Sequence, residues 1–220
     1  PLGRTHTIAC LCCGIATCLM IPTLTGCAST GIAVRESFGQ AKREQLVDRV
    51  QEARGEQDEA KEQLASTLDE FQALTSHDGG DLERLYRKLD RELDRSQDQA
   101  DDVSKKIRDV ERVASALFSE WERELGDYSS VELRRTAEHQ LDESRVRYSD
   151  MLAAMRRAEG SMQPVLTALG DQVLFLKHNL NASAIASLEN SFLPQLEADI
   201  ARLISEMEAS IAEADEFISA

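Results

Sequence analysis

Hydrophobic residues recur in alternating steps of four and three along the first long segment of the chain. The repeating positions are Leu46, Val50, Ala53, Gln57, Ala60, Leu64, Thr67, Phe71 and Leu74. Such a repeat places one apolar stripe along a helix and is typical of the seam of a coiled coil. Gln57 and Thr67 interrupt the stripe with polar side chains. The pattern predicts a long helix over residues 34–76.

Three later segments carry the same repeat, over residues 81–126, 130–178 and 182–220. The turns between the four segments read SHDGGD, GDYSSVE and HNLNAS. Gly79 and Gly80 favour the end of a helix, and Ser129 with Glu132 has the spacing of a capping box. No segment shows the two-residue alternation that is typical of a strand.

Helices of similar length that are joined by short turns favour antiparallel neighbours. We therefore expect an all-α fold, an elongated antiparallel helical bundle or coiled coil of about four long helices. The helices would run up-down-up-down in one domain over residues 34–220. Two alternatives stay open at this point: a more open set of hairpins, and a dimer that completes the seams.

Two prolines bracket the last predicted turn. Pro164 and Pro194 lie fifteen residues on either side of Asn179, so we predict that they face each other and that the tip beyond them bends as a unit. Only three charged residues occur in the segment 165–193. The tip either packs as core or stays partly exposed for a partner or an apolar ligand. The candidate surface consists of Val165, Leu166, Leu169, Phe175, Leu176 and Phe192.

Residues 1–26 have the layout of a secretory signal peptide. A short start with Arg4 precedes an apolar run from Ile8 to Ile21 and a small-residue exit. The run is too short to span a bilayer as a helix, and Pro22 breaks it. The sequence therefore predicts export, with this leader removed.

The stretch that closes the leader, Leu24, Thr25, Gly26 and Cys27, resembles the bacterial lipobox. In a lipobox the cysteine is acylated and becomes the new N-terminus, so the resemblance implies membrane attachment through acyl chains on Cys27 and a lipidated tether over residues 27–33. Ala28 in place of an aspartate implies the outer membrane, with the protein facing the periplasm. A retained signal anchor with an unmodified Cys27 is the alternative.

The composition narrows the classes of partner. The chain has 25 Lys and Arg, 40 Asp and Glu, and a net charge of −15. Such an acidic chain is unsuited to nucleic acid and is repelled by anionic lipid surfaces, so acyl chains would have to supply the membrane contact. Four of the five cysteines precede Gly26, which leaves no disulfide framework after the leader is removed.

Patterns of catalytic residues are missing from the sequence. It contains no HExxH, no Glu-x-x-His pair, no phosphate loop and no nucleophile elbow. His77 lies beside Asp78 and Asp81 in a turn, but a zinc site needs three or four converging ligands. We therefore predict no enzyme, no metal site and no cofactor.

The general layout, together with the segments SFGQAKREQLVDRV and FLPQLEADIARLI, resembles a family of uncharacterised bacterial lipoproteins catalogued as a domain of unknown function. The resemblance implies a helical fold and an envelope location, with no functional residue beyond Cys27. We expect a structural spacer or docking scaffold that meets an envelope protein or a second copy of itself. The alternative is a carrier that holds a lipid or another apolar ligand in the tip between Pro164 and Pro194.

Overall fold

The computed structural model describes the backbone of residues 28–76 and 81–219, and the side chains of these residues from Ala41 onwards except that of Ala182. The chain divides into two compact units, Pro1–Glu36 and Ser37–Ala220. The second unit forms the helical bundle. The predicted signal peptide, Cys27 and the first turn with His77, Gly79 and Gly80 lie outside the described residues.

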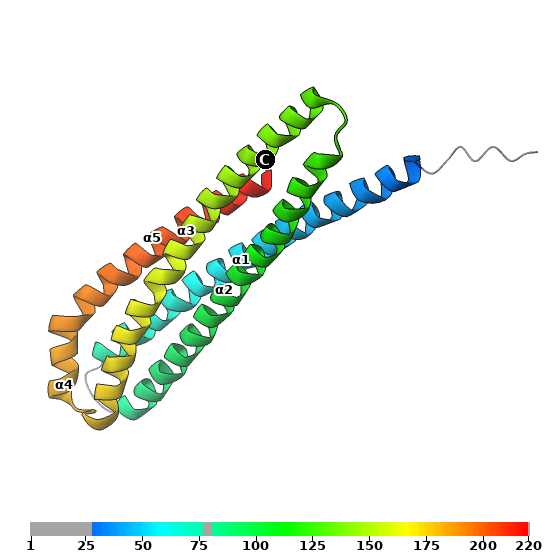
Figure 1. Ribbon diagram of the computed structural model, residues 1–220. Helices are drawn as coiled ribbons and strands as arrows, with labels where there is room; N and C mark the ends of the chain where they lie inside the picture. Colours follow the sequence, from blue (N-terminus) through cyan, green and yellow to red (C-terminus); the bar gives the residue numbers. More distant parts are fainter. Residues whose placement is uncertain (1–27, 77–80, 220) are drawn as a thin grey trace, which may run out of the picture. The chain divides into compact units, whose positions relative to one another are not determined.

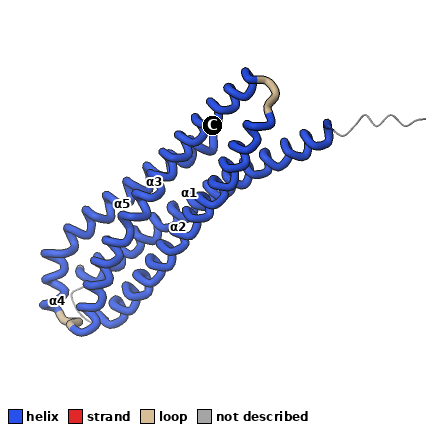
Figure 2. The backbone as a smooth tube through the Cα atoms, viewed as in Figure 1, coloured by secondary structure: helices blue, strands red, loops and turns tan. Residues whose placement is uncertain are grey.

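Four long helices make up the fold, and they confirm the all-α prediction. They are α1 (Ala28–Thr75), α2 (Leu82–Glu124), α3 (Val131–His178) and α5 (Leu193–Ser219). A short 3-10 turn, η1 (Leu125–Asp127), follows α2, while α4 (Ala182–Ser187) and the π-helical segment η2 (Leu188–Phe192) lie between α3 and α5. Figure 2 shows helices joined by short loops, with no strand in the described part of the chain.

The four long helices close into a ring in which each neighbour runs antiparallel. Lys106 pairs with Glu52 at 2.9 Å, and Lys88 nearer the start of α2 pairs with Glu70 nearer the end of α1. The pairs Gln57 with Ser210 and Gln72 with Glu197 show the same opposed direction for α1 and α5. Helix α3 packs against both α2 and α5. The bundle of Figure 1 is therefore up-down-up-down, and its seams close within one chain.

The predicted seams form the core. All nine seam positions of α1 are buried, none more than 3% exposed. The stripes of the other helices are buried in the same way at most positions, because the antiparallel neighbours meet stripe to stripe. The largest side chains that are fully buried in this core are Phe71, Leu64, Leu74, Leu89, Ile107, Met151, Met155, Met162, Leu166, Leu169, Leu176 and Leu196.

Helix starts are capped by side chains, and one cap differs from the prediction. The structure places the N-cap of α3 at Ser130 rather than at Ser129, because the extended backbone of Ser130 directs its hydroxyl to the N–H of Leu133 at 3.3 Å. Asp81 and Asn181 accept from the backbone in the same way at the starts of α2 and α4. α1 begins at Ala28, so its first turns cover residues that the sequence assigned to a tether.

The two prolines do not face each other, and this part of the prediction is wrong. Ser161 donates to Glu206 across the hairpin, and counting three residues along each helix from that pair places Pro164 level with Leu203. Pro194 lies nine residues away from that level. α3 continues as a helix through Pro164. The register shifts because α4 and the π-helical segment occupy the chain after the turn, before α5 starts its return.

A bend is present only on the returning side of this hairpin. Leu193 donates its N–H to the Leu188 carbonyl, five residues back, which is the bond of a π-helix. The next residue, Pro194, has no N–H to donate. Figure 1 shows α4 and α5 meeting at an angle at this point.

Candidate functional site

The surface predicted at the tip is mostly interior. Val165, Leu166, Leu169 and Leu176 are all buried, so these four side chains are packed among the helices. They form one continuous core with the residues of α1 and α2 that surround the first turn. The physical reason is the closed ring of helices, since α1 and α2 cover the apolar face that α3 presents at this end.

The other two residues of the predicted tip surface lie nearer to solvent. Phe192 is half-buried and makes an edge-on contact with Phe71, with 5.5 Å between ring centroids. Phe175 is 44% exposed and has Leu174, 57% exposed, beside it on α3. What the tip offers to a partner is therefore a small apolar pair rather than a broad surface.

Two groups of buried polar side chains interrupt the core at the positions where polar residues interrupt the stripe of α1. In the first, Ser210 donates to the side-chain oxygen of Gln57 at 2.7 Å, and both side chains are fully buried. The Gln57 amide also reaches the Met155 carbonyl, at 3.5 Å. Helices α1, α3 and α5 thus meet in one hydrogen-bonded layer.

The second polar group joins α1 to α2. Gln63 donates to the Glu92 carboxylate at 2.9 Å, and Thr67 shares a hydrogen bond of 2.9 Å with Ser96. Arg95 donates to the other Glu92 oxygen at 2.7 Å. The hydrogen bond from Gln63, supported by the charge of Arg95, lowers the pKa of Glu92 below its ordinary value of 4.5, although burial acts in the opposite direction. These bonds satisfy the polar groups and leave little capacity for a ligand.

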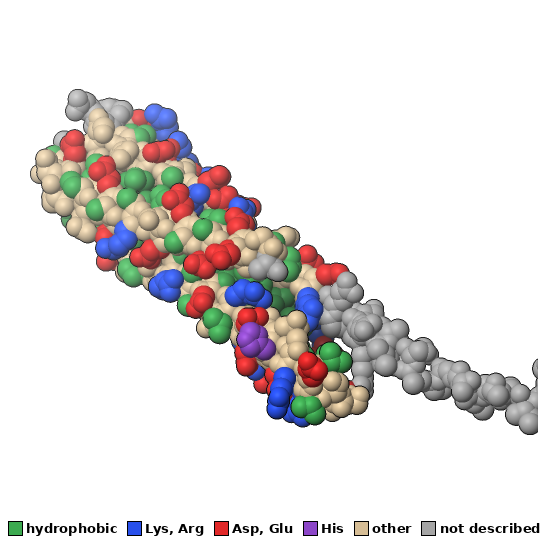
Figure 3. All heavy atoms as spheres, turned by 90° about the horizontal axis from the view of Figure 1, so that it is seen from above, with side chains coloured by type: hydrophobic (Ala, Val, Ile, Leu, Met, Phe, Trp, Pro, Cys, Tyr) green, Lys and Arg blue, Asp and Glu red, His purple; other side chains and the backbone are tan. Residues whose placement is uncertain are grey.

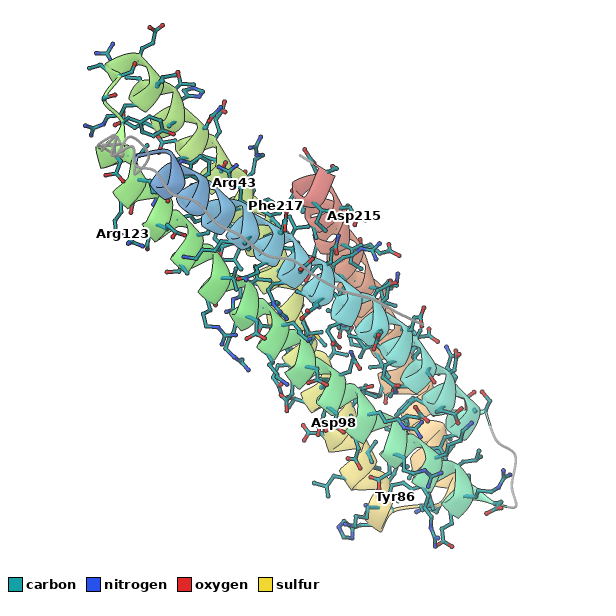
Figure 4. The ribbon with its side chains drawn as sticks, turned by 90° about the vertical axis from the view of Figure 1, so that its right-hand side faces the viewer. Arg43, Tyr86, Asp98, Arg123, Asp215 and Phe217 are labelled. Atoms are coloured by element: carbon teal, nitrogen blue, oxygen red, sulfur yellow. The ribbon has the colours of Figure 1, made fainter. Side chains whose placement is uncertain are left out.

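A hollow of about 450 Å³ opens at the opposite end of the bundle from the tip. We call it the aromatic hollow. Its floor and walls are apolar and are formed by Leu46, Val47, Leu117, Phe118, Trp121, Phe217 and Ile218. Its rim is polar and is formed by Arg43, Gln140, Glu143, Ser144 and Arg147. Figure 4 shows Arg43 on α1 and Phe217 on α5 at this end, and Tyr86 at the other.

The aromatic hollow lies where residues of α1, α2, α3 and the last described turn of α5 meet. The ring of Phe217, two residues before the end of α5, lies 6.5 Å from the ring of Tyr148 on α3. Residues 131–147 of α3 precede that level, which corresponds to about 25 Å of helix. Figure 1 shows the joined ends of α2 and α3 extending past the end of α5. The aromatic hollow is therefore lined by residues of all four long helices near the level of Phe217.

Two aromatic rings that line the aromatic hollow, those of Phe118 and Phe217, both pack against Tyr148. Phe118 packs edge-on against Tyr148, with 5.4 Å between centroids, and Tyr148 packs in the same way against Phe217. Burial, with the nearby charge of Glu111, raises the pKa of Tyr148 to about 12. The three rings therefore pack against each other and form one wall of the aromatic hollow.

The charges around the aromatic hollow are not all paired. Lys42 pairs with Glu120 at 2.6 Å and Arg145 with Glu122 at 2.7 Å. Arg43 instead lies over the ring of Trp121, 4.5 Å from its centroid. Arg147 reaches no acidic partner, and neither does Arg43, among the described side chains. The rim of the apolar concavity thus carries two arginines without an acidic partner in the described part of the chain and one acid, Glu143, which pairs with His139.

A second, smaller groove of about 270 Å³ lies between α2 and α3. Arg156, one of its lining residues, pairs with Glu111 at 2.6 Å and with Glu159 at 2.5 Å. Hydrogen bonds from Arg156 thus hold both acids, and they raise the pKa of the guanidinium. This groove is polar and already satisfied, which distinguishes it from the aromatic hollow.

The aromatic hollow was not predicted from the sequence. Trp121 and Ile218 fit the repeats of their helices and have the pattern of ordinary seam residues. Arg43 and Arg147 have the pattern of surface charges. The lining residues come from four helices that are far apart in the sequence, so the hollow becomes evident only once the helices are aligned.

The described residues give two further findings. Within 28–76 and 81–219, no group of three or more His, Cys, Asp or Glu side chains is arranged to hold a metal ion. None of the described helices combines the length and the hydrophobicity needed to cross a bilayer. His139 pairs with Glu143 at 3.5 Å, an exposed contact one helical turn apart.

Comparison with known proteins gives a match to one family. A model described as "Protein of unknown function (DUF2959)" matches residues 32–220. No curated protein and no solved structure matches the chain. The match confirms the resemblance to a family of unknown function, while the lipid anchor at Cys27 stays a prediction.

Proposed function

The chain belongs to this family of unknown function (DUF2959), and from that premise we propose that it is a lipid-anchored scaffold of the bacterial cell envelope. Cys27 would carry the acyl chains, and the bundle would face the periplasm from the outer membrane as a spacer and a docking platform. Its partners would be an envelope protein or a second copy of the chain. Residues of the bundle would perform no reaction.

One observation carries the proposal. The stretch LTGC follows an apolar run from Ile8 to Ile21, which is the order in which a lipobox closes a signal peptide. A lipid-attachment cysteine must come first in the mature chain, and the residues after Cys27, with the whole bundle, would then belong to the anchored protein.

The bundle itself favours a scaffold over the tip carrier. A carrier needs an accessible apolar space, but the tip residues that would line it are packed against each other. The outward surface carries acidic and basic side chains along its length, as the face in Figure 3 illustrates. Long helices with satisfied seams and a charged exterior suit a protein that holds a distance and presents surfaces.

Metabolic labelling with an alkyne fatty acid tests the anchor. We expect the unaltered protein to incorporate the label and to sediment with outer membranes. Cys27→Ser should lose the label and leave that fraction. Cys18→Ser is the matched control, because it removes a leader cysteine and should change neither readout. Equal labelling of the Cys27→Ser protein would contradict the proposal.

Site-specific photo-crosslinking tests the scaffold role. A photoreactive residue at Phe175 would sit on the exposed apolar pair of the tip, and one at Asp171 would sit one turn earlier on the exposed charged surface of the same helix. In intact cells we expect Phe175 to give a defined crosslinked envelope protein or a crosslinked dimer, and Asp171 to give less. A chain that crosslinks to nothing from either position, and sediments as a monomer, would remove the docking role.

A further inference from the structure

We propose that the aromatic hollow binds an amphiphile with one anionic head group and one aliphatic chain, as in a fatty acid. The inference rests on the side chains that line the aromatic hollow and does not depend on the lipid anchor or on the scaffold role. It also places an apolar ligand at the opposite end of the bundle from the tip.

The walls of the aromatic hollow suit an aliphatic chain. Its volume, about 450 Å³, falls in the usual range for small-ligand sites, roughly 300–1,000 Å³. Leu46, Leu117 and Phe118 close it from below as buried core residues, while Trp121 and Phe217 are half-buried and line the accessible part. A chain lying there would cover the apolar side chains of Trp121, Phe217 and Ile218, which are only half-buried.

The rim suits an anionic head. Both arginines lie on exposed positions of the rim and have no acid partner among the described side chains. The neighbouring cations Lys42 and Arg145 are paired with glutamates, whereas Arg43 contacts the ring of Trp121 and Arg147 has no acidic partner among the described residues. Both guanidinium groups can therefore bind an anion at the edge of the apolar surface. A guanidinium binds a carboxylate or a phosphate with two parallel hydrogen bonds, which a neutral head cannot accept with comparable strength.

The shape of the site favours a small amphiphile over the helix of a partner protein. A docked helix needs an apolar stripe that continues for several turns. On α3, however, the positions that border the aromatic hollow are Gln140, Glu143, Ser144 and Arg147, which are all polar. The apolar surface is thus confined to one concavity with cations on its border, the arrangement that matches a single chain with a charged end.

Trp121 provides a direct probe because it is the only tryptophan of the chain and lines the aromatic hollow. Bromine quenches indole fluorescence only at contact. The full chain carrying Cys27→Ser, which excludes a covalent acyl chain, would be titrated with 9,10-dibromostearate. We expect saturable quenching with a one-to-one stoichiometry. The methyl ester of the same acid lacks the charge, and its affinity should be lower by a factor of about ten or more.

Variants then locate the two parts of the ligand. The double variant Arg43→Gln with Arg147→Gln should weaken binding of the acid about tenfold or more and leave binding of the ester unchanged. Arg157→Gln is the matched control, since Arg157 is an exposed arginine of the same helix away from the aromatic hollow. Val47→Phe should fill the space and remove binding of both probes. Circular dichroism of each variant checks that the helices are retained.

The outcomes separate the proposal from its competitors. Equal affinity for acid and ester, or unchanged affinity in the double variant, would overturn the anionic head. Quenching that persists in Val47→Phe, or no quenching of the parent chain, would overturn the site itself. Vesicles containing brominated anionic phospholipid form a second arm. Quenching by vesicles but not by the free acid would replace the single-chain ligand with a membrane surface and so overturn the proposal.

Discussion

The two ends of the bundle carry similar hydrophobic residues, but these residues are buried to different extents. At the tip, the apolar residues of α3 are covered on every side, and only Leu174 and Phe175 remain exposed. At the other end, Trp121, Phe217 and Ile218 continue the seams of their helices but stay half-buried around a hollow. The difference lies in the surroundings of each end, since α4, η2 and α5 cover the tip, whereas the described residues at the opposite end leave a concavity. Burial is therefore decided by which neighbours are present at a given level, more than by the hydrophobicity of the residue itself.

The sharpest test of this comparison is a matched pair of truncations. Leu169→Ala removes a fully buried tip side chain and should lower the free energy of unfolding by about 3 kcal/mol. Ile218→Ala removes a side chain of similar size from the wall of the aromatic hollow, and the loss should be about 1 kcal/mol or less. Urea denaturation measures both. Equal losses would mean that the aromatic hollow is closed in solution.

The second largest effect on the free energy of unfolding is expected from the buried hydrogen bond between Ser210 and Gln57. Ser210→Ala leaves the buried Gln57 oxygen without its donor at 2.7 Å and should cost about 2 kcal/mol. Ser205→Ala, at an exposed position of the same helix, should have almost no effect. Replacing Gln57 by Leu together with Ser210→Ala should recover most of the loss. Failure to recover it would point to packing rather than to an unsatisfied group.

The buried Glu92 should make the free energy of unfolding depend on pH in the acidic range. Its pKa is lower in the folded protein than its ordinary value of 4.5, so its stabilising contribution is fully present above pH 4.5 and is lost as the pH falls through the folded value. We expect the stability difference between the parent chain and Glu92→Gln to be largest at neutral pH and to shrink below pH 4.5. Asp94→Asn, an exposed change nearby, provides the control for general acid effects. A difference that stays constant with pH would show that the Glu92 carboxylate charge is not the cause.

Tyr148 should produce the smallest effect at neutral pH and report on the open end. Because its pKa is raised to about 12, the neutral phenol is favoured in the folded state, and this contribution is present below pH 10 and lost as the pH rises towards 12. Absorbance titration should show one tyrosine ionising near pH 12, and that component should vanish in Tyr148→Phe. Tyr128→Phe, which changes an exposed ring, should leave it in place. Ionisation of all tyrosines together would show that the aromatic wall is open.

The sequence was sufficient for the helices and most of the core because the seam repeat is a local property of each helix. All nine α1 positions from Leu46 to Leu74 are buried as predicted. The helix bounds agree within a few residues except at the start of α1 and in the segment 182–220, which was predicted as one helix and is divided into α4, η2 and α5. The seams could be predicted to meet because antiparallel helices joined by short turns present their stripes to each other.

The features that the sequence did not predict depend on alignment between helices. Counting from Asn179 gave facing prolines, but α4 and the π-helical segment shift the return of the chain, so Pro164 lies level with Leu203. Leu169 is fully buried and Ile218 only half-buried for the same reason, since each depends on which helices lie beside it. Arg43 and Arg147 are far apart in sequence, and only the fold brings them to one rim.

The two groups of buried polar side chains, Gln57 with Ser210 and Thr67 with Ser96, also restrict how the helices can slide along each other. A strict seven-residue repeat allows a helix to slide by one repeat, about 10 Å, with apolar residues still meeting apolar residues. Sliding α5 in this way would set Leu203 or Phe217 against the Gln57 amide in place of Ser210, at a cost of about 1–3 kcal/mol for the stranded polar group. Thr67 and Ser96 apply the same restraint between α1 and α2. The two polar groups therefore fix the register of α5 and α2 against α1, in addition to the order of the helices that the turns determine.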